Sequence, residues 1–334
     1  PINVLLKYYN NDWWRIFQFA AENKLIVSHG NIKRLKLEQE LIGDHLVVDA
    51  QTLIILAHYD CLAALQSIKH VHITFSSVST LQYQHLSWNY PQMQSLMDWI
   101  QSSNNIVYEA DGFIPEDEML EFFSKDFIAG CNVARKEKIP FLYSDVLAVT
   151  FQMISKDNPL VDIDFISIPA LCNCLEENQK SQKNQMLYRL LKGCTFISFN
   201  ADTILEQIIT HEFNVSTDFL SPFLICKSDY DMESFAIVYL QAIHRLNDVH
   251  EDAAISLAKI ILDDTFRVWR RGTYYRETAK NYDDSQALEK ATRILHYVRT
   301  VLAGIKEIFP NDAEKWQQYT ELKSIVLREV KEKT

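Results

Sequence analysis

Two hydrophobic patterns alternate along the first two thirds of the chain. Short β-branched apolar runs are typical of strands, and apolar residues spaced three and four apart are typical of helices. In the stretch His45–Leu65 a strand-like run, 46–48, ends at Asp49 and leads into a helical pattern, 53–65. Strands are expected at 46–48, 71–75, 106–109, 139–143, 161–168 and 194–199. Helices are expected at 53–65, 76–86, 92–100, 119–138, 146–155, 170–177, 185–192 and 203–211.

The two ends of the chain show the helical pattern alone. Helices are expected at 10–23 and 31–41, and from Met232 to Lys333 with breaks near Asn247, Gly272, Asn281–Asp284 and Phe309–Asn311. Strands alternating with helices indicate a parallel sheet flanked by helices. We therefore predict an α/β fold with a helical C-terminal domain, divided into a helical segment at 1–44, an α/β domain at 45–225 and a helical domain at 226–334.

Composition limits the classes of function. The 334 residues suggest two or three domains, and the presence of only 7 Gly and 8 Pro favours a helix-rich chain. A formal net charge of −11 excludes nucleic-acid binding through bulk charge, so such binding requires a local basic patch. No run approaches the roughly 20 apolar residues of a membrane span, and we expect no membrane partner.

The six cysteines lack the paired spacing of a zinc site and fall in apolar stretches. We expect buried free thiols, as in a reducing cytoplasm. Because the chain begins at Pro1 rather than Met, we expect it to be part of a longer protein.

Several common sites are missing from the sequence. The only closely spaced small-residue turn, at Asp111 and Gly112, lacks the further glycines of a phosphate-binding loop. There is no GxSxG nucleophile motif, and no histidine stands at metal-ligand spacing from a second His or Cys. Dinucleotide binding, NTP binding and this class of serine hydrolase are therefore not expected.

Two acids each end a predicted strand and open a predicted helix. Asp49 follows the strand 46–48, and Asp145 follows the strand 139–143. Neighbouring parallel strands lie about 4.8 Å apart, so their ends can bring two carboxylates together. Paired carboxylates suit Mg²⁺ or Mn²⁺, which can activate water for phosphodiester hydrolysis. The simpler alternative is that such an acid only caps its helix.

From Leu46 to about Ile209 the chain resembles the PIN domain family, and especially the PIN-like domains fused to helical repeats in large bacterial proteins. Val47-Val48-Asp49 matches the family's Asp at the end of the first strand. Tyr143-Ser144-Asp145-Val146-Leu147-Ala148 matches its Asp that opens a later helix. The resemblance implies a metal-dependent ribonuclease that uses a metal-activated water, with RNA as substrate and with Asp49 and Asp145 as catalytic residues and metal ligands.

The chain departs from the family pattern at two positions. Gln82 stands where a Glu is expected, which makes it an uncharged third ligand, and no carboxylate stands near Ser167–Pro169, the fourth position. The alternative is therefore a catalytically inactive PIN-like fold that serves as a protein-interaction module. In that case the C-terminal helices bind the protein partner.

The most basic stretch is Thr265–Tyr282, with five cationic residues and one acidic residue. Guanidinium groups can contact phosphate, and aromatic rings can stack on bases. The nucleic-acid-binding residues expected here are Arg267, Trp269, Arg270, Arg271, Tyr274 and Arg276. The alternative is a helix that ends near Gly272, with cations beside the negative end of its dipole.

Overall fold

The structure is a computed structural model that describes residues 12–22, 26–27, 32–112, 123–144, 162–195, 199–224, 232–282 and 284–331. The chain divides into two compact units, Pro1–Ser198 and Phe199–Thr334, called unit 1 and unit 2 below. The boundary lies earlier than the predicted 225/226, because the helices after Ser198 pack with the C-terminal helices. The predicted segment 1–44 is not a separate domain, since its helices pack on the sheet unit.

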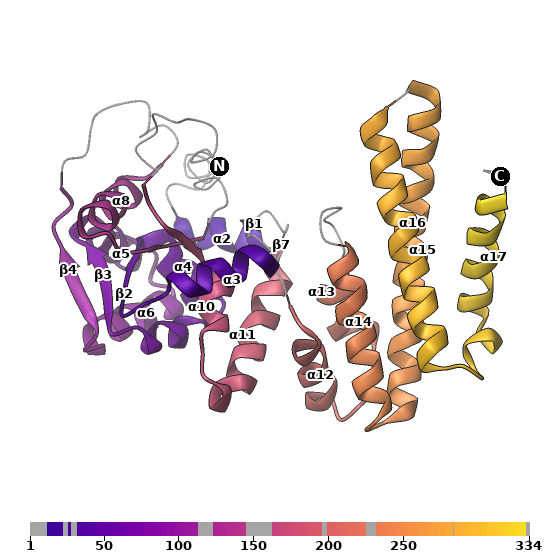
Figure 1. The fold of residues 1–334 in the computed structure, drawn as a ribbon. Helices are drawn as coiled ribbons and strands as arrows, with labels where there is room; N and C mark the ends of the chain where they lie inside the picture. Colours follow the sequence, from indigo (N-terminus) through magenta and orange to yellow (C-terminus); the bar gives the residue numbers. More distant parts are fainter. Residues whose placement is uncertain are drawn as a thin grey trace. The chain divides into compact units, whose positions relative to one another are not determined.

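A five-stranded, all-parallel sheet forms the centre of unit 1 (Figure 1). Its strand order is β4-β3-β2-β5-β6, which places β2 in the middle. The strands are β2 (His45–Val48), β3 (His70–Thr74), β4 (Ile106–Glu109), β5 (Phe141–Tyr143) and β6 (Phe165–Ser167). All five match predicted strands, and the parallel pairing confirms the α/β prediction for this unit. The sixth predicted strand is outside the sheet: β7 (Cys194–Thr195) pairs instead with β1 (Ile26–Val27).

Described helices lie between β2 and β3, between β3 and β4, and between β4 and β5, as a parallel sheet requires, and further helices belong to the same unit. They are α2 (Trp13–Glu22), α3 (Ile32–Leu41), α4 (Ala50–His58), α5 (Phe75–Trp88), α6 (Pro91–Ser102), α8 (Lys125–Glu137), α10 (Ile168–Asn173) and α11 (Lys180–Gly193), with 3₁₀ turns at Leu62–Ser67 and Glu177–Gln179. Two predictions were wrong here. The helix expected at 53–65 ends at His58, and the loop expected at 178–184 is helical. Its Lys, Gln and Ser residues are polar but carry no helix breaker.

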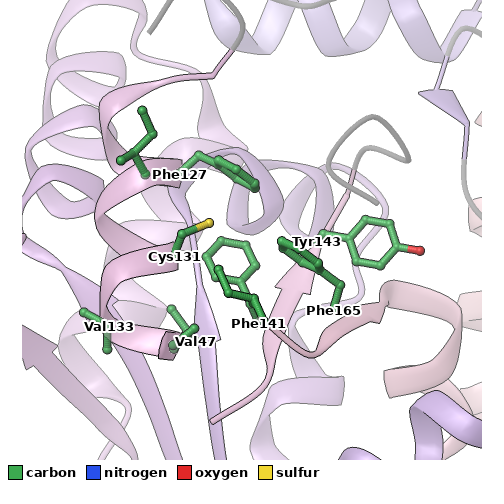
Figure 2. Close-up of a cluster of buried hydrophobic side chains, with 10 residues drawn as sticks. Val47, Phe127, Cys131, Val133, Phe141, Tyr143 and Phe165 are labelled. Carbon is green, nitrogen blue, oxygen red and sulfur yellow. The ribbon is translucent and has the colours of Figure 1, made fainter. Parts of the chain in front are cut away.

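Helix α8 packs against β2, β5 and β6 through a cluster of buried side chains (Figure 2). Phe141, on β5, contacts both Phe127 and Phe165, with ring centroids 5.2 and 5.7 Å away and edge-to-face geometry. The helix can approach the sheet closely because residue 130 is glycine. A Cβ atom at Gly130 would lie 2.4 Å from the Phe141 ring, inside any real contact distance. This packing fixes where the first turn of α8 lies.

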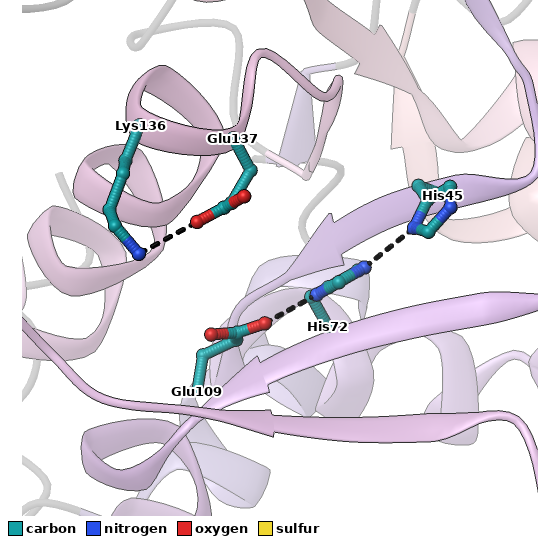
Figure 3. A network of polar contacts seen from close by, with 5 residues as sticks. All are labelled: His45, His72, Glu109, Lys136 and Glu137. Carbon is teal, nitrogen blue, oxygen red and sulfur yellow. Dashed lines mark hydrogen bonds and ion pairs between the residues drawn. The ribbon is translucent and has the colours of Figure 1, made fainter.

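Side chains also connect the first three strands of the sheet (Figure 3). His72 Nδ1 donates to Glu109 Oε1 at 2.8 Å, and His72 Nε2 lies 3.0 Å from His45 Nδ1. The Glu109 carboxylate can only accept, which makes Nδ1 the donor of His72. The network therefore adds side-chain bonds between β2, β3 and β4 to the backbone ladder.

Unit 2 is a bundle of helices (Figure 1). They are α12 (Ala201–Thr210), α13 (Thr217–Leu224), α14 (Met232–Asn247), α15 (Glu251–Tyr282), α16 (Ser285–Ile308) and α17 (Gln317–Lys331), with a 3₁₀ turn at Ala313–Lys315. The break predicted at Gly272 was wrong, since α15 continues through it. A Cβ atom there would lie 2.8 Å from Ile294 Cγ2, so this glycine permits close packing of α15 on α16 rather than ending a helix.

The structure also bears on two predictions drawn from composition. Cys61, Cys131, Cys172 and Cys174 form no disulfide, as expected. None of the helices in the described ranges has the length and apolar character needed to cross a bilayer.

Candidate acidic site at the carboxyl edge of the sheet

Asp49 stands at the carboxyl end of β2, the central strand. Its extended backbone makes it the N-cap of α4, and its Oδ1 accepts a hydrogen bond from the Thr52 amide at 2.8 Å. The side chain is only 3% exposed. The cap that we considered as the simpler alternative therefore exists, and it holds the carboxylate in one orientation.

A second buried carboxylate, Asp126, comes from the first turn of α8. Ser124 caps this helix by accepting a hydrogen bond from the Phe127 amide, and Asp126 follows two residues later. Asp126 Oδ2 accepts the Ala50 amide hydrogen at 3.2 Å, which brings it beside the residue that follows Asp49. Its exposed fraction is 2%. Asp49 and Asp126 are called the acidic pair below.

Burial raises the pKa of both carboxyl groups, and Asp126 also acts on Asp49. Burial, and next the charge of Asp126, raise the pKa of Asp49 to about 7. Burial likewise raises the pKa of Asp126, against hydrogen bonds from Ser124 and from backbone amides. Among the described residues, neither carboxylate forms an ion pair with a Lys or Arg. Two buried like charges are strongly unfavourable unless a proton or a cation is added.

Other polar groups lie at the same edge. Gln51 Nε2 donates to Ser144 Oγ at 3.2 Å, which links the start of α4 to the end of β5. The Cys131 thiol, one turn along α8 from Asp126, has its pKa raised by burial and then by the charge of Asp49. These contacts show that the ends of β2 and β5 and the first two turns of α8 meet at one place.

Of the two predicted metal ligands that lie in the described residues, one belongs to the acidic pair. Asp49 is there, whereas Gln82 is exposed on α5 and is not among the groups that contact Asp49 or Asp126. The buried glutamine of α5 is Gln84, whose Oε1 accepts the Trp13 amide hydrogen. Two residues along a helix turn a side chain by about 200°, which separates the environments of these glutamines. Asp145, two residues after the end of β5, lies outside the described residues.

Sequence reasoning missed Asp126. The helix was expected to begin at Met119, which placed Asp126 in the interior of a longer helix. Helix α8 instead begins at Lys125, so Asp126 lies in its first turn. The signal that could have found it is Ser124-Lys125-Asp126, a capping serine with an acid in the first helical turn.

The predicted nucleic-acid-binding residues of α15 divide into two sets. Trp269 is 3% exposed in the helix packing, so its ring is not available to stack on a base. Arg276 lies over that ring, with its guanidinium 4.2 Å from the ring centroid. The exposed residues are Arg267, Arg270, Arg271 and Tyr274.

The acidic pair offers carboxylate oxygens, the ligands that Mg²⁺ and Mn²⁺ prefer. The described part of the chain holds no cluster of three or more His, Cys, Asp or Glu side chains that could bind a metal ion. Mg²⁺ is commonly held by one or two carboxylates and several waters, so two acids are compatible with such an ion.

The fold and site were compared with known proteins. No family model, no curated protein and no solved structure matches this chain.

Proposed function

We propose that unit 1 is a PIN-like domain that binds Mg²⁺ or Mn²⁺ at the acidic pair and hydrolyses phosphodiester bonds of RNA. The observation that carries this proposal is the burial of two carboxyl groups, with the charge of one raising the pKa of the other and without a cationic partner among the described residues. A purely structural pair would leave two charges unneutralised or hold a proton between them. A divalent cation removes the same electrostatic penalty and can also activate a water molecule.

The order of acids along the chain supports the resemblance further. In the family pattern one Asp ends the first strand, another opens a later helix, and an acid follows the next strand. Asp49 ends β2, Asp126 lies in the first turn of α8, and Asp145 comes two residues after β5. With Asp126 in the third position, Asp145 moves to the fourth, and three of the four positions carry an acid.

The residues of this chain have separate tasks in the proposed reaction. When bound, the metal ion supplies an activated water and neutralises charge that develops on the phosphate. Asp49 and Asp126 hold the ion, and the amide hydrogens of Thr52 and Ala50 fix the orientation of the two carboxylates. Because the pKa of Asp49 is about 7, the pair has to release a proton when it accepts the ion near neutral pH.

Calorimetric titration with Mn²⁺ tests the site directly. The wild-type chain should bind saturably, with proton release that changes the observed heat between buffers of different ionisation enthalpy. Asp49→Asn and Asp126→Asn should each abolish binding and RNA hydrolysis. Asp202→Asn is the matched control, because Asp202 pairs with Arg245 in unit 2, and it should bind like wild type.

Absence of saturable binding at millimolar Mn²⁺ would overturn the proposal. It would favour the second candidate, an inactive PIN-like fold that binds a protein. An exposed apolar face on α5 is the observation behind that candidate. Leu86 is 82% exposed, and Phe75 and Tyr83 are also exposed. If unit 1 is such an interaction module, Asp49→Asn should change neither metal binding nor partner binding.

A further inference from the structure

The C-terminal half of α15 presents a compact set of cations. Arg267, Arg270, Arg271 and Tyr274 are spaced at i, i+3, i+4 and i+7, which places them on one side of the helix. All four are exposed, and Tyr274 is 67% exposed. This set is called the cationic face below.

The cationic face extends past the neighbouring helix. At about 1.5 Å per residue, the 32 residues of α15 span about 48 Å, and the 16 residues of α14 span about half of that. The α15–α16 hairpin therefore continues beyond the end of α14 within unit 2 (Figure 1). The inward residues support it: Arg276 lies over Trp269 and donates to Thr273 Oγ1 at 2.8 Å, and Gly272 allows α16 to pack closely.

The positive charge on this face is only partly neutralised. Arg189, Arg245 and Arg293 each pair with a carboxylate. Arg267 and Arg270, by contrast, form no ion pair within 4.0 Å among the residues that the structure describes, and Arg270 lies over the Phe266 ring. Asp263 and Glu277 are exposed on the same side of this helix, about one turn before Arg267 and one turn after Tyr274.

The nearest buried acid offsets little of this charge. Asp264 lies among the packed helices, and burial raises its pKa to about 7 against the opposing effect of Arg267 and Arg271. Near neutral pH this carboxyl group is therefore partly protonated and does not cancel a full positive charge. The face remains cationic on a chain whose net charge is −11.

We propose that the cationic face binds single-stranded RNA, with the three guanidinium groups on consecutive phosphates and Tyr274 stacked on a base. Planar guanidinium forks match phosphate oxygens, and an exposed aromatic ring beside them favours an unpaired strand over an acidic protein surface. The choice of RNA rests on the proposed function of unit 1, whereas the existence of an anion-binding face does not.

Fluorescence anisotropy with a labelled single-stranded oligoribonucleotide tests the proposal on the full chain. Measurements from about 50 to 200 mM KCl, in EDTA, keep metal binding out of the experiment. Three phosphate contacts predict a log–log salt slope of about −2 for the wild type. Replacing Arg267, Arg270 and Arg271 together with Ala should weaken binding at least tenfold and bring the slope close to zero. Tyr274→Ala should weaken binding without changing the slope.

The matched control replaces Arg189, Arg245 and Arg293 with Ala, which removes the same charge from ion-paired positions. Equal affinity and slope for the two triple variants would overturn the proposal. Binding of a polyglutamate peptide in preference to RNA would also overturn it, in favour of an acidic protein partner. Asp49→Asn should lose metal binding and RNA hydrolysis but keep its affinity for RNA in EDTA, which separates this test from that of the acidic pair.

Discussion

In unit 1, two carboxylates from segments far apart in the sequence meet under cover of packed helices. In unit 2, three guanidinium groups lie within two turns of one helix and face outward. The acidic pair depends on the sheet, on the close approach of α8 and on the register of β2 and β5. The cationic face comes from the periodicity of one helix, which its packing on α16 supports. A buried site is therefore lost when the packing around it is lost, whereas a surface site survives most changes elsewhere.

The largest expected effect comes from removing the ring at the centre of the α8 packing. Phe141→Ala should destabilise unit 1 by about 3–5 kcal/mol, because it empties a fully buried position in contact with Phe127 and Phe165. Hydrogen exchange should rise across β2, β5 and α8, while α15 and α16 keep their protection and the chain keeps its RNA affinity. An equal rise of hydrogen exchange in α15 would contradict this prediction, since it would mean that the two sites belong to one cooperative unfolding unit.

The next effect is a gain in stability. Burial raises the pKa of Asp49 in the folded state. Between about pH 4 and pH 7, Asp49 is therefore protonated in the folded chain and ionised in the unfolded chain. Folding then takes up a proton, so the folded state loses stability as pH rises through this window. In metal-free buffer Asp49→Asn should therefore be more stable than wild type by up to about 4 kcal/mol at pH 8, and the gain should disappear near pH 4.

Urea denaturation at both pH values measures this gain. A constant difference between pH 4 and pH 8 would show that ionisation of the acidic pair is not its source. Asp202→Asn should show no comparable gain at either pH, because Asp202 is ion-paired with Arg245.

A smaller effect follows from the glycine under α8. Gly130→Ala gains up to about 1 kcal/mol of helix propensity and costs about 1–3 kcal/mol of overpacking against Phe141, for a net loss of about 1 kcal/mol. Mn²⁺ affinity should fall several-fold as Asp126 is displaced from Ala50. Gly43→Ala is the matched control, since a Cβ atom there meets nothing within 4 Å. Unchanged Mn²⁺ affinity in Gly130→Ala would show that the acidic pair does not depend on the close packing of α8 on the sheet.

Local periodicity was enough to predict much of the fold. The run Leu46-Val47-Val48 identified the central strand, and Asp49 at its end was correctly singled out as a residue at the carboxyl edge. Asp126 was not singled out, because its role depends on where α8 begins and on which strand that helix covers. Gln82 was chosen by its distance along the chain from a strand, and the rotation of α5 turns it outward.

Glycines were the other limit of the sequence. Gly272 has the character of a helix break, and only the position of Ile294 on α16 shows that its missing Cβ serves packing. The predicted domain boundary lies too far along the chain for a similar reason. Helices α12 and α13 resemble the helices of unit 1 in their hydrophobic pattern, but they pack with the helices of unit 2. Both errors concern partners that are distant in the sequence, which periodicity along one segment does not identify.

The hydrogen bond from the Ala50 amide to Asp126 spans 76 positions of the chain. During synthesis Asp49 leaves the ribosome well before Asp126, and the first acid alone is a helix cap with a single carboxylate. If the acidic pair binds a divalent ion, high affinity can therefore arise only after α8 has been made and has docked on the sheet. If unit 1 is a nuclease, it therefore becomes active only when it has folded, and an incomplete chain on the ribosome does not hydrolyse RNA.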